Sequence, residues 1–133
     1  MGMTIRVSRP AFDDLLAEAA RAAPEECCGI LLGREGAIDE TRPTRNLALD
    51  PRRRFEIDPQ ALVDAHRAAR AGGPQVVGYF HSHPDGPAEP SATDRAHATG
   101  DGRVWAIIGE GKVGWWRDAA REFVALSYRV TGR

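Results

Sequence analysis

The stretch QVVGYFHSHP, residues 75–84, decides how the chain is arranged. It begins as a short apolar run with valine, tyrosine and phenylalanine, which is typical of a strand buried in a sheet. Because alternate residues of a strand point to the same face, His81 and His83 present two imidazoles toward one point. Pro84 cannot continue the hydrogen-bonding ladder. The sequence therefore predicts a central strand over 75–81 with two histidines at its end.

A second polar segment, Ser91-Ala92-Thr93-Asp94, follows a loop at 84–90 that is rich in proline and glycine. We expect Ser91 to open a short helix to about residue 99, which returns Asp94 toward the histidines. Two imidazole nitrogens and one carboxylate oxygen suit zinc and leave a fourth position for water. Zinc lowers the pKa of such a water toward about 7, which makes hydroxide available at neutral pH.

Simpler interpretations of the same residues stay open on spacing alone. An isolated His-x-His often occurs by chance, and exposed strand histidines are usually inert. Ser91-x-x-Asp94 is also the pattern of a capping box, in which the two residues bond each other's backbone N–H groups.

The rest of the chain predicts the α/β (α+β) class, with a mixed β-sheet flanked by helices. Apolar residues at helical spacing predict helices over about 10–23 and from Asp58, as N-cap, to about 71. Glu35-Gly36 predicts a hairpin turn, and 43–54 is irregular and polar. The expected strands, besides the central one, are 4–8, 26–34, 37–42, one around Phe55 and Ile57, 105–109, 113–116 and 123–129.

Glu26 is a candidate general base at the start of the strand that holds Cys27 and Cys28. Its carboxylate would reach the histidines if that strand neighbours the strand ending at His81, an adjacency that spacing does not reveal. The adjacent cysteines are poorly placed to staple the fold. We interpret them as small apolar residues on a buried strand, with contact between Cys27 and the active site as the alternative.

Composition sets the class of protein. The 133 residues predict one domain, 1–133, and 42% hydrophobic with 28% charged residues are globular values. A formal net charge of -1 gives no reason to expect nucleic acid as a partner. The basic run 52–54 is interpreted as a solvated loop or strand edge rather than a binding patch. The sequence predicts neither a membrane span nor a signal peptide, so we expect a cytoplasmic location.

Other conspicuous side chains are interpreted as structural. His66 and His97 have no comparable partners in the sequence, and we expect both on helix surfaces. Trp105, Trp115 and Trp116 are interpreted as core and sheet-surface residues.

Taken together, these motifs resemble the JAMM (MPN+) metalloprotease family. The family pattern is a glutamate on an early strand, then H-[ST]-H-P, and then S-x-x-D with ten residues between the second histidine and the aspartate. This chain has His81-Ser82-His83-Pro84 and Ser91-Ala92-Thr93-Asp94, with ten residues, 84–93, in between. The family's glutamate lies three residues before the first glycine of its strand, which selects Glu26 over Glu25.

The resemblance implies a curved sheet between helices, the JAMM/MPN (cytidine-deaminase-like) architecture. It implies one zinc ion per chain held by His81, His83 and Asp94. Glu26 would carry a proton from the attacking water to the leaving amine, and Ser91 would hydrogen-bond the oxyanion.

The chain is most similar to the small prokaryotic branch of that family, whose members act on ubiquitin-like sulfur-carrier proteins beyond a C-terminal Gly-Gly. Two glycines suit a narrow groove, since only a chain without side chains passes close to the metal. The loop Asp85–Pro90 is a candidate wall for that groove. The sequence leaves the oligomeric state open, a homodimer included.

Two other functions compete with this hydrolase. One is a non-catalytic MPN-like scaffold, as in relatives that have lost the metal ligands, although all five motif positions are filled here. The other is an iron oxygenase, because two histidines and a carboxylate also form a facial triad.

Overall fold

The computed structural model describes residues 4–119 and 122–132. In those residues the chain forms eight strands and three helices. In chain order they are β1 (Thr4–Ser8), α1 (Arg9–Ala22), β2 (Cys28–Arg34), β3 (Ala37–Thr44), α2 (Pro59–Arg70), β4 (Gln75–Ser82), α3 (Ala92–His97), β5 (Val104–Gly109), β6 (Lys112–Ala119), β7 (Glu122–Ala125) and β8 (Ser127–Thr131).

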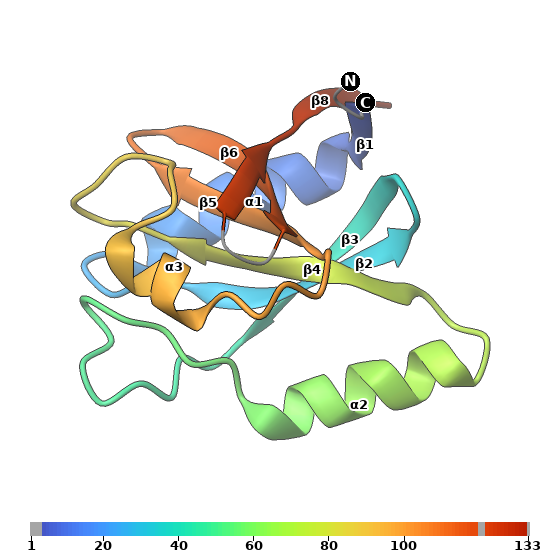
Figure 1. The fold of residues 1–133 in the computed structure, drawn as a ribbon, viewed down its shortest axis with the longest axis horizontal. Coiled ribbons are helices and arrows are strands. Elements are labelled where there is room, and N and C mark those ends of the chain that lie inside the picture. Colours follow the sequence, from blue (N-terminus) through green and yellow to red (C-terminus); the bar gives the residue numbers. More distant parts are fainter. Residues whose placement is uncertain (1–3, 120–121, 133) are drawn as a thin grey trace.

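The strands make one mixed sheet in the order β7-β6-β5-β4-β2-β3-β1-β8. Strand β4 is central, antiparallel to β2 and parallel to β5, as the apolar run predicts. Helices α1 and α2 lie on opposite sides of the sheet, and α3 lies beyond the carboxyl end of β4 (Figure 1). The expected curved mixed sheet with flanking helices is confirmed.

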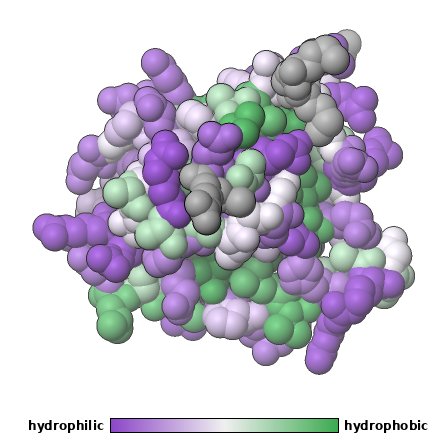
Figure 2. All heavy atoms as spheres, in the orientation of Figure 1, coloured by the Kyte–Doolittle hydropathy of each residue, from purple (hydrophilic) through white to green (hydrophobic). Residues whose placement is uncertain are grey.

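Two apolar clusters hold these layers together. Leu15 of α1 packs with Val7, Leu31 and Phe80 on one face of the sheet. On the other face, Ala65 of α2 packs with a smaller group of buried residues, Cys28, Ile30, Leu32 and Ile57. Hydrophilic side chains cover most of the face that Figure 2 shows, with hydrophobic residues in smaller groups. Among the described residues, no helix is long and apolar enough to cross a membrane.

Local signals in the sequence set most element boundaries. Asp58 caps α2 by accepting a hydrogen bond from the Gln60 N–H at 2.9 Å, as predicted. The β2–β3 hairpin turns at Gly36, whose φ of +77° favours glycine. Strand β2 begins at Cys28, so Glu26 lies just before the strand rather than on it.

The expected strand around Phe55 and Ile57 is wrong. Ile57 makes only an isolated bridge to Asn46. The Glu56 N–H is bonded by the Asn46 side chain at 3.1 Å instead of by a neighbouring strand. Side-chain acceptors of this kind compete with strand pairing, and sequence periodicity does not report them.

The expected strand 123–129 is two strands, divided at Leu126. Strand β7 pairs with β6 at one edge of the sheet, and β8 pairs in parallel with β1 at the other edge. Leu126 donates its N–H to the Trp115 carbonyl at 2.8 Å and packs against the α1-side core. Leu126 is thus the single residue between the strand at one edge of the sheet and the strand at the other.

The close approach of β4 and β5 gives a stability prediction. A Cβ on Gly78 would lie 1.7 Å from the Val104 carbonyl oxygen, so Gly78→Ala should force the two strands apart. We expect it to lower the free energy of unfolding by about 3 kcal/mol in a urea titration. Gly86→Ala is the control, because its nearest neighbour would be the His83 Cβ at 3.6 Å. Equal stability of the two variants would contradict the account.

Candidate functional site

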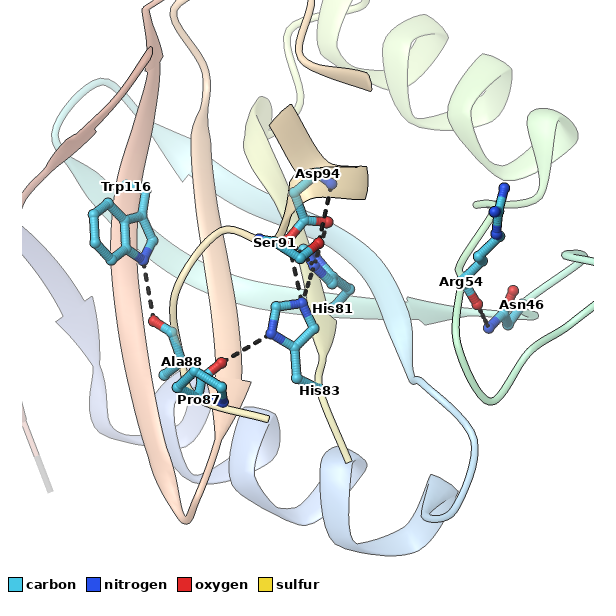
Figure 3. Close-up of polar contacts among 9 residues, drawn as sticks. All are labelled: Asn46, Arg54, His81, His83, Pro87, Ala88, Ser91, Asp94 and Trp116. Carbon is cyan, nitrogen blue, oxygen red and sulfur yellow. Dashed lines mark hydrogen bonds and ion pairs between the residues drawn. The ribbon is translucent and has the colours of Figure 1, made fainter. Parts of the chain in front are cut away.

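Three potential metal ligands converge where β4 ends and α3 begins. His81 Nε2 lies 3.2 Å from His83 Nε2 and 3.0 Å from Asp94 Oδ1. His83 Nε2 lies 3.2 Å from Asp94 Oδ2. These ligand atoms all lie within 4.8 Å of one another, so the three residues could hold a metal ion (Figure 3). His81 is 1% and Asp94 3% exposed. His81 is therefore not an exposed strand histidine of the kind that is usually inert.

The loop after β4 orients the second histidine. His83 Nδ1 lies 2.8 Å from the Pro87 carbonyl oxygen, which only a protonated Nδ1 can bond. In the neutral ring, the lone pair is therefore on Nε2, which faces His81 and Asp94. Trp116 Nε1 donates to the neighbouring Ala88 carbonyl at 3.2 Å and supports this loop from β6 (Figure 3).

Aromatic rings hold the first histidine. The Phe55 ring stacks on the His81 imidazole with centroids 4.2 Å apart and an interplanar angle of 17°. Trp105 meets the same imidazole edge-on, with centroids 5.7 Å apart. This packing fixes the ring plane of His81 and excludes water from its apolar edges.

Asp94 takes part in a capping box as well as in the cluster. Its N–H donates to Ser91 Oγ at 3.1 Å, and its Oδ2 accepts from the Ser91 N–H at 2.9 Å. The capping interpretation is therefore correct, and it coexists with the convergence on the histidines. The cap fixes the direction of the Asp94 carboxylate, which lies 3.1 Å from His81 Nε2 through the same Oδ2.

Glu26 lies beside the cluster, as expected if β2 and β4 are neighbours. In the sheet register Cys28 lies opposite His81. Cys27 donates its N–H to Ser82 Oγ at 2.8 Å and accepts from the Ser82 N–H at 3.1 Å. Ser82 lies between the two histidines in the sequence, so these bonds fasten the Glu26 segment to the cluster of His81, His83 and Asp94.

A cavity of about 130 Å³ joins the candidate catalytic groups. Glu26, His83, Ser91 and Asp94 all contribute to its wall. Sequence reasoning missed five further residues that line it: Arg53, Arg54, Phe55, Thr93 and His97. His97 lies three residues after Asp94 on a helix, and that spacing was a usable signal. The arginines and Phe55 carried no such signal.

The pKa values of the ionisable groups at this site are strongly shifted. Burial raises the pKa of Glu26 to about 7, an effect that the charge of His83 reduces and that of Asp94 reinforces. Burial also lowers the pKa of His81, which keeps the imidazole neutral as a ligand must be. For Asp94, burial would raise the pKa, but the contacts of its carboxylate with the His81 and His83 rings outweigh this effect and hold the pKa well below its usual range.

The two cysteines are buried and form no disulfide, as the apolar interpretation predicts. Burial raises the pKa of Cys27 to about 11, so the group is a thiol at neutral pH. Cys27 packs in the α1-side core. The tryptophan interpretation is also confirmed for Trp105 and Trp115, which are buried on β5 and β6. His97 is exposed on α3, as expected, although it reaches the cavity.

Comparison with known proteins places these features in context. Residues 8–123 match the family model described as prokaryotic homologs of the JAB domain. The chain is 34% identical to a protein of Haloferax volcanii named desampylase, over 95% of this chain and 96% of that protein. It is 33% identical to a probable TtuB-protein conjugate cleaving protease of Thermus thermophilus, over 70% of this chain and 62% of that protein.

Solved structures share the architecture. A solution structure of a Desulfitobacterium hafniense protein matches with a TM-score of 0.85 and 27% identity, over 98% of this chain and 94% of that one. A JAB1/MPN domain protein of Archaeoglobus fulgidus matches with a TM-score of 0.62 and 22% identity, over 96% of this chain and 99% of that one. At that identity the second match shows the fold alone.

The raised pKa of Glu26 predicts how stability depends on pH in metal-free protein. The pKa of Glu26 is 4.5 ordinarily and about 7 in the fold. Between these pH values the folded state therefore binds more protons than the unfolded state. Stability from this group is complete below pH 4.5 and is lost as pH rises through about 7. The unfolding free energy of wild type minus that of Glu26→Gln should therefore fall across this window in urea titrations at several pH values. A difference independent of pH would contradict the burial argument.

Proposed function

Because this chain belongs to the prokaryotic JAB-domain family, we propose that it is a zinc-dependent isopeptidase for conjugates of a ubiquitin-like protein. The general class is plain: the chain is a hydrolase of the JAMM type. Our proposal goes further, because it names zinc as the metal, a role for each site residue and the bond that is cleaved. The observation that carries it is the convergence of three metal-ligand atoms beside a cavity whose wall includes Glu26.

The donor set fits zinc. Two imidazole nitrogens and a carboxylate form the usual three-protein-ligand set of a catalytic zinc site. We assign His81, His83 and Asp94 as the ligands of one ion per chain. The Pro87 carbonyl and the Ser91 N–H support two of them, which matches the outer hydrogen bonds that metal ligands normally make.

Glu26 is proposed as the general base. When bound, zinc would lower the pKa of a water molecule and polarise the scissile carbonyl. The Glu26 carboxylate can then accept a proton from water and return it to the departing amine. Glu26 lines the same cavity as His83 and Asp94, which supports a role for its carboxylate toward a water bound there.

Ser91 is proposed to stabilise the oxyanion. Its Oγ accepts from the Asp94 N–H, so the hydroxyl hydrogen can be directed into the cavity that Ser91 lines. A hydrogen bond to the developing negative charge strengthens in the transition state. The cap therefore uses the oxygen of the Ser91 hydroxyl as an acceptor, and the catalytic contact uses its hydrogen as a donor.

The substrate proposal rests on the relatives and on the small volume of the cavity beside Glu26. The relatives are named for desampylation and for the cleavage of TtuB conjugates. We propose that this chain cleaves after the C-terminal Gly-Gly of a ubiquitin-like sulfur-carrier protein, because glycines allow close approach of the backbone. The Asp85–Pro90 loop stays a candidate wall for the Gly-Gly groove. The bonds of His83 to Pro87 and of Trp116 to Ala88 hold the loop, although none of its residues lines the cavity beside Glu26.

The scaffold alternative is disfavoured because all five motif residues are present and four of them share one cavity. An iron triad would use the same ligands. It gives no role to Glu26, whose carboxylate is buried beside them. The single domain and the cytoplasmic location stay predictions from the sequence, which leaves the oligomeric state open, a homodimer included.

Glu26→Gln tests this function. The change removes the base but no ligand, so kcat should fall about 10²–10⁴-fold while the zinc content stays the same. The assay measures release of a lysine peptide joined by an isopeptide bond to the Gly-Gly end of a ubiquitin-like protein. Glu25→Gln is the matched control, since Glu25 is the exposed neighbour. Full turnover by Glu26→Gln would refute the role, and lost zinc would refute the ligand assignment.

A further inference from the structure

The backbone of Glu26 is held by a distant loop rather than by the sheet. This Asn46 loop, residues 45–58, connects β3 to α2. The Glu26 N–H donates to the Pro51 carbonyl at 2.7 Å, and the Glu26 carbonyl accepts from Asn46 Nδ2 at 3.0 Å. Glu26 precedes β2, so these loop contacts fix its peptide groups on both sides.

The Asn46 side chain organises that loop. Nδ2 also donates to the Arg54 carbonyl at 3.0 Å and lies 3.5 Å from the Pro51 carbonyl oxygen. Oδ1 accepts from the N–H groups of Ala48 at 3.0 Å and Glu56 at 3.1 Å. A primary amide offers two donors and an acceptor with two lone pairs, and here both ends are used. Figure 3 shows Asn46 beside Arg54, away from the histidine cluster.

The same loop covers a candidate metal ligand. Phe55 follows Arg54, whose carbonyl Asn46 bonds, and its ring stacks on His81 with centroids 4.2 Å apart. The Asn46 amide thus links the backbone of Glu26 to the segment that holds Phe55. Phe55 in turn packs on His81. A displacement of Glu26 would change its distance to the reacting water, and such misplacement is costly even when it is about 1 Å.

We propose that Asn46 is a positioning residue for hydrolysis, which acts by holding the Glu26 backbone at the distance and angle that proton transfer requires. This inference rests on the proposed function of Glu26. Neither alanine nor aspartate replaces the amide. Alanine makes none of the contacts, and aspartate keeps acceptors for Ala48 and Glu56 but cannot donate to the Glu26 and Arg54 carbonyls.

Kinetics of the zinc-loaded protein test the proposal with the Gly-Gly isopeptide substrate. Asn46→Ala should lower kcat about 10–100-fold, with KM within about twofold and unchanged zinc content. In the Glu26→Gln background, the same change should alter the residual rate less than about twofold, because the group it positions is gone. An equal loss in both backgrounds, or an unchanged kcat in the single variant, would overturn the proposal. Asn46→Asp replaces Asn46→Ala if the latter does not fold.

Asp58→Ala controls for general weakening of the loop. Asp58 ends the same connection and caps α2 through Gln60, and its side chain has no bond to Glu26 among those the structure describes. We expect this variant to lower the melting temperature while kcat stays at the wild-type value. If Asp58→Ala lowers kcat as much as Asn46→Ala does, the effect belongs to loop stability and the positioning role is wrong.

Amide hydrogen exchange in zinc-free protein tests the contact without any activity. The Glu26 N–H, bonded to Pro51, should be protected in wild type and in Asp58→Ala. Its exchange should be at least about tenfold faster in Asn46→Ala, since local opening controls protection. Unchanged protection would overturn the proposal. If wild type cleaves no conjugate, the proposed function fails, and the exchange result still decides whether Asn46 holds Glu26.

Discussion

The antiparallel register of β2 and β4 is the constraint on which the site depends. It sets Cys28 opposite His81, and the Cys27–Ser82 bonds continue the pairing one residue beyond the strand. A slip by one residue would move every β4 side chain to the other face. His81 and His83 would then point away from Asp94, and Glu26 would lose its place beside them. The fold thus specifies the chemistry through strand pairing.

The site concentrates polar groups that the interior does not favour. Burial raises the pKa of Glu26 and lowers that of His81, so each group resists its charged form. A neutral imidazole is the form that a metal ligand needs, and strongly shifted pKa values are typical of functional sites. The capping box and the Pro87 carbonyl supply the hydrogen bonds that keep Asp94 and His83 oriented. Burial of these groups therefore lowers the stability of the fold at the site. Packing in the sheet on both sides offsets that loss.

Local pattern was enough to predict part of this structure. Residue alternation placed His81 and His83 on one face, and the spacing to Asp94 gave both the cap and the carboxylate. The pairing of β8 with β1 joins residues more than a hundred positions apart, which local periodicity does not encode. The roles of Asn46 and Phe55 were also hidden. They depend on where an irregular loop lies in space, and nothing in their sequence spacing relates them to Glu26 or His81.

The central claim is that His81, His83 and Asp94 hold a zinc ion, and metal analysis tests it most directly. Elemental mass spectrometry on purified wild type, His81→Ala and His66→Ala would give the zinc content per chain. His66 lies on α2 and is not part of the cluster, so it controls for loss of a histidine. We predict about one zinc per chain in wild type and His66→Ala and almost none in His81→Ala. Wild-type protein that holds no zinc even after zinc is added would contradict the account.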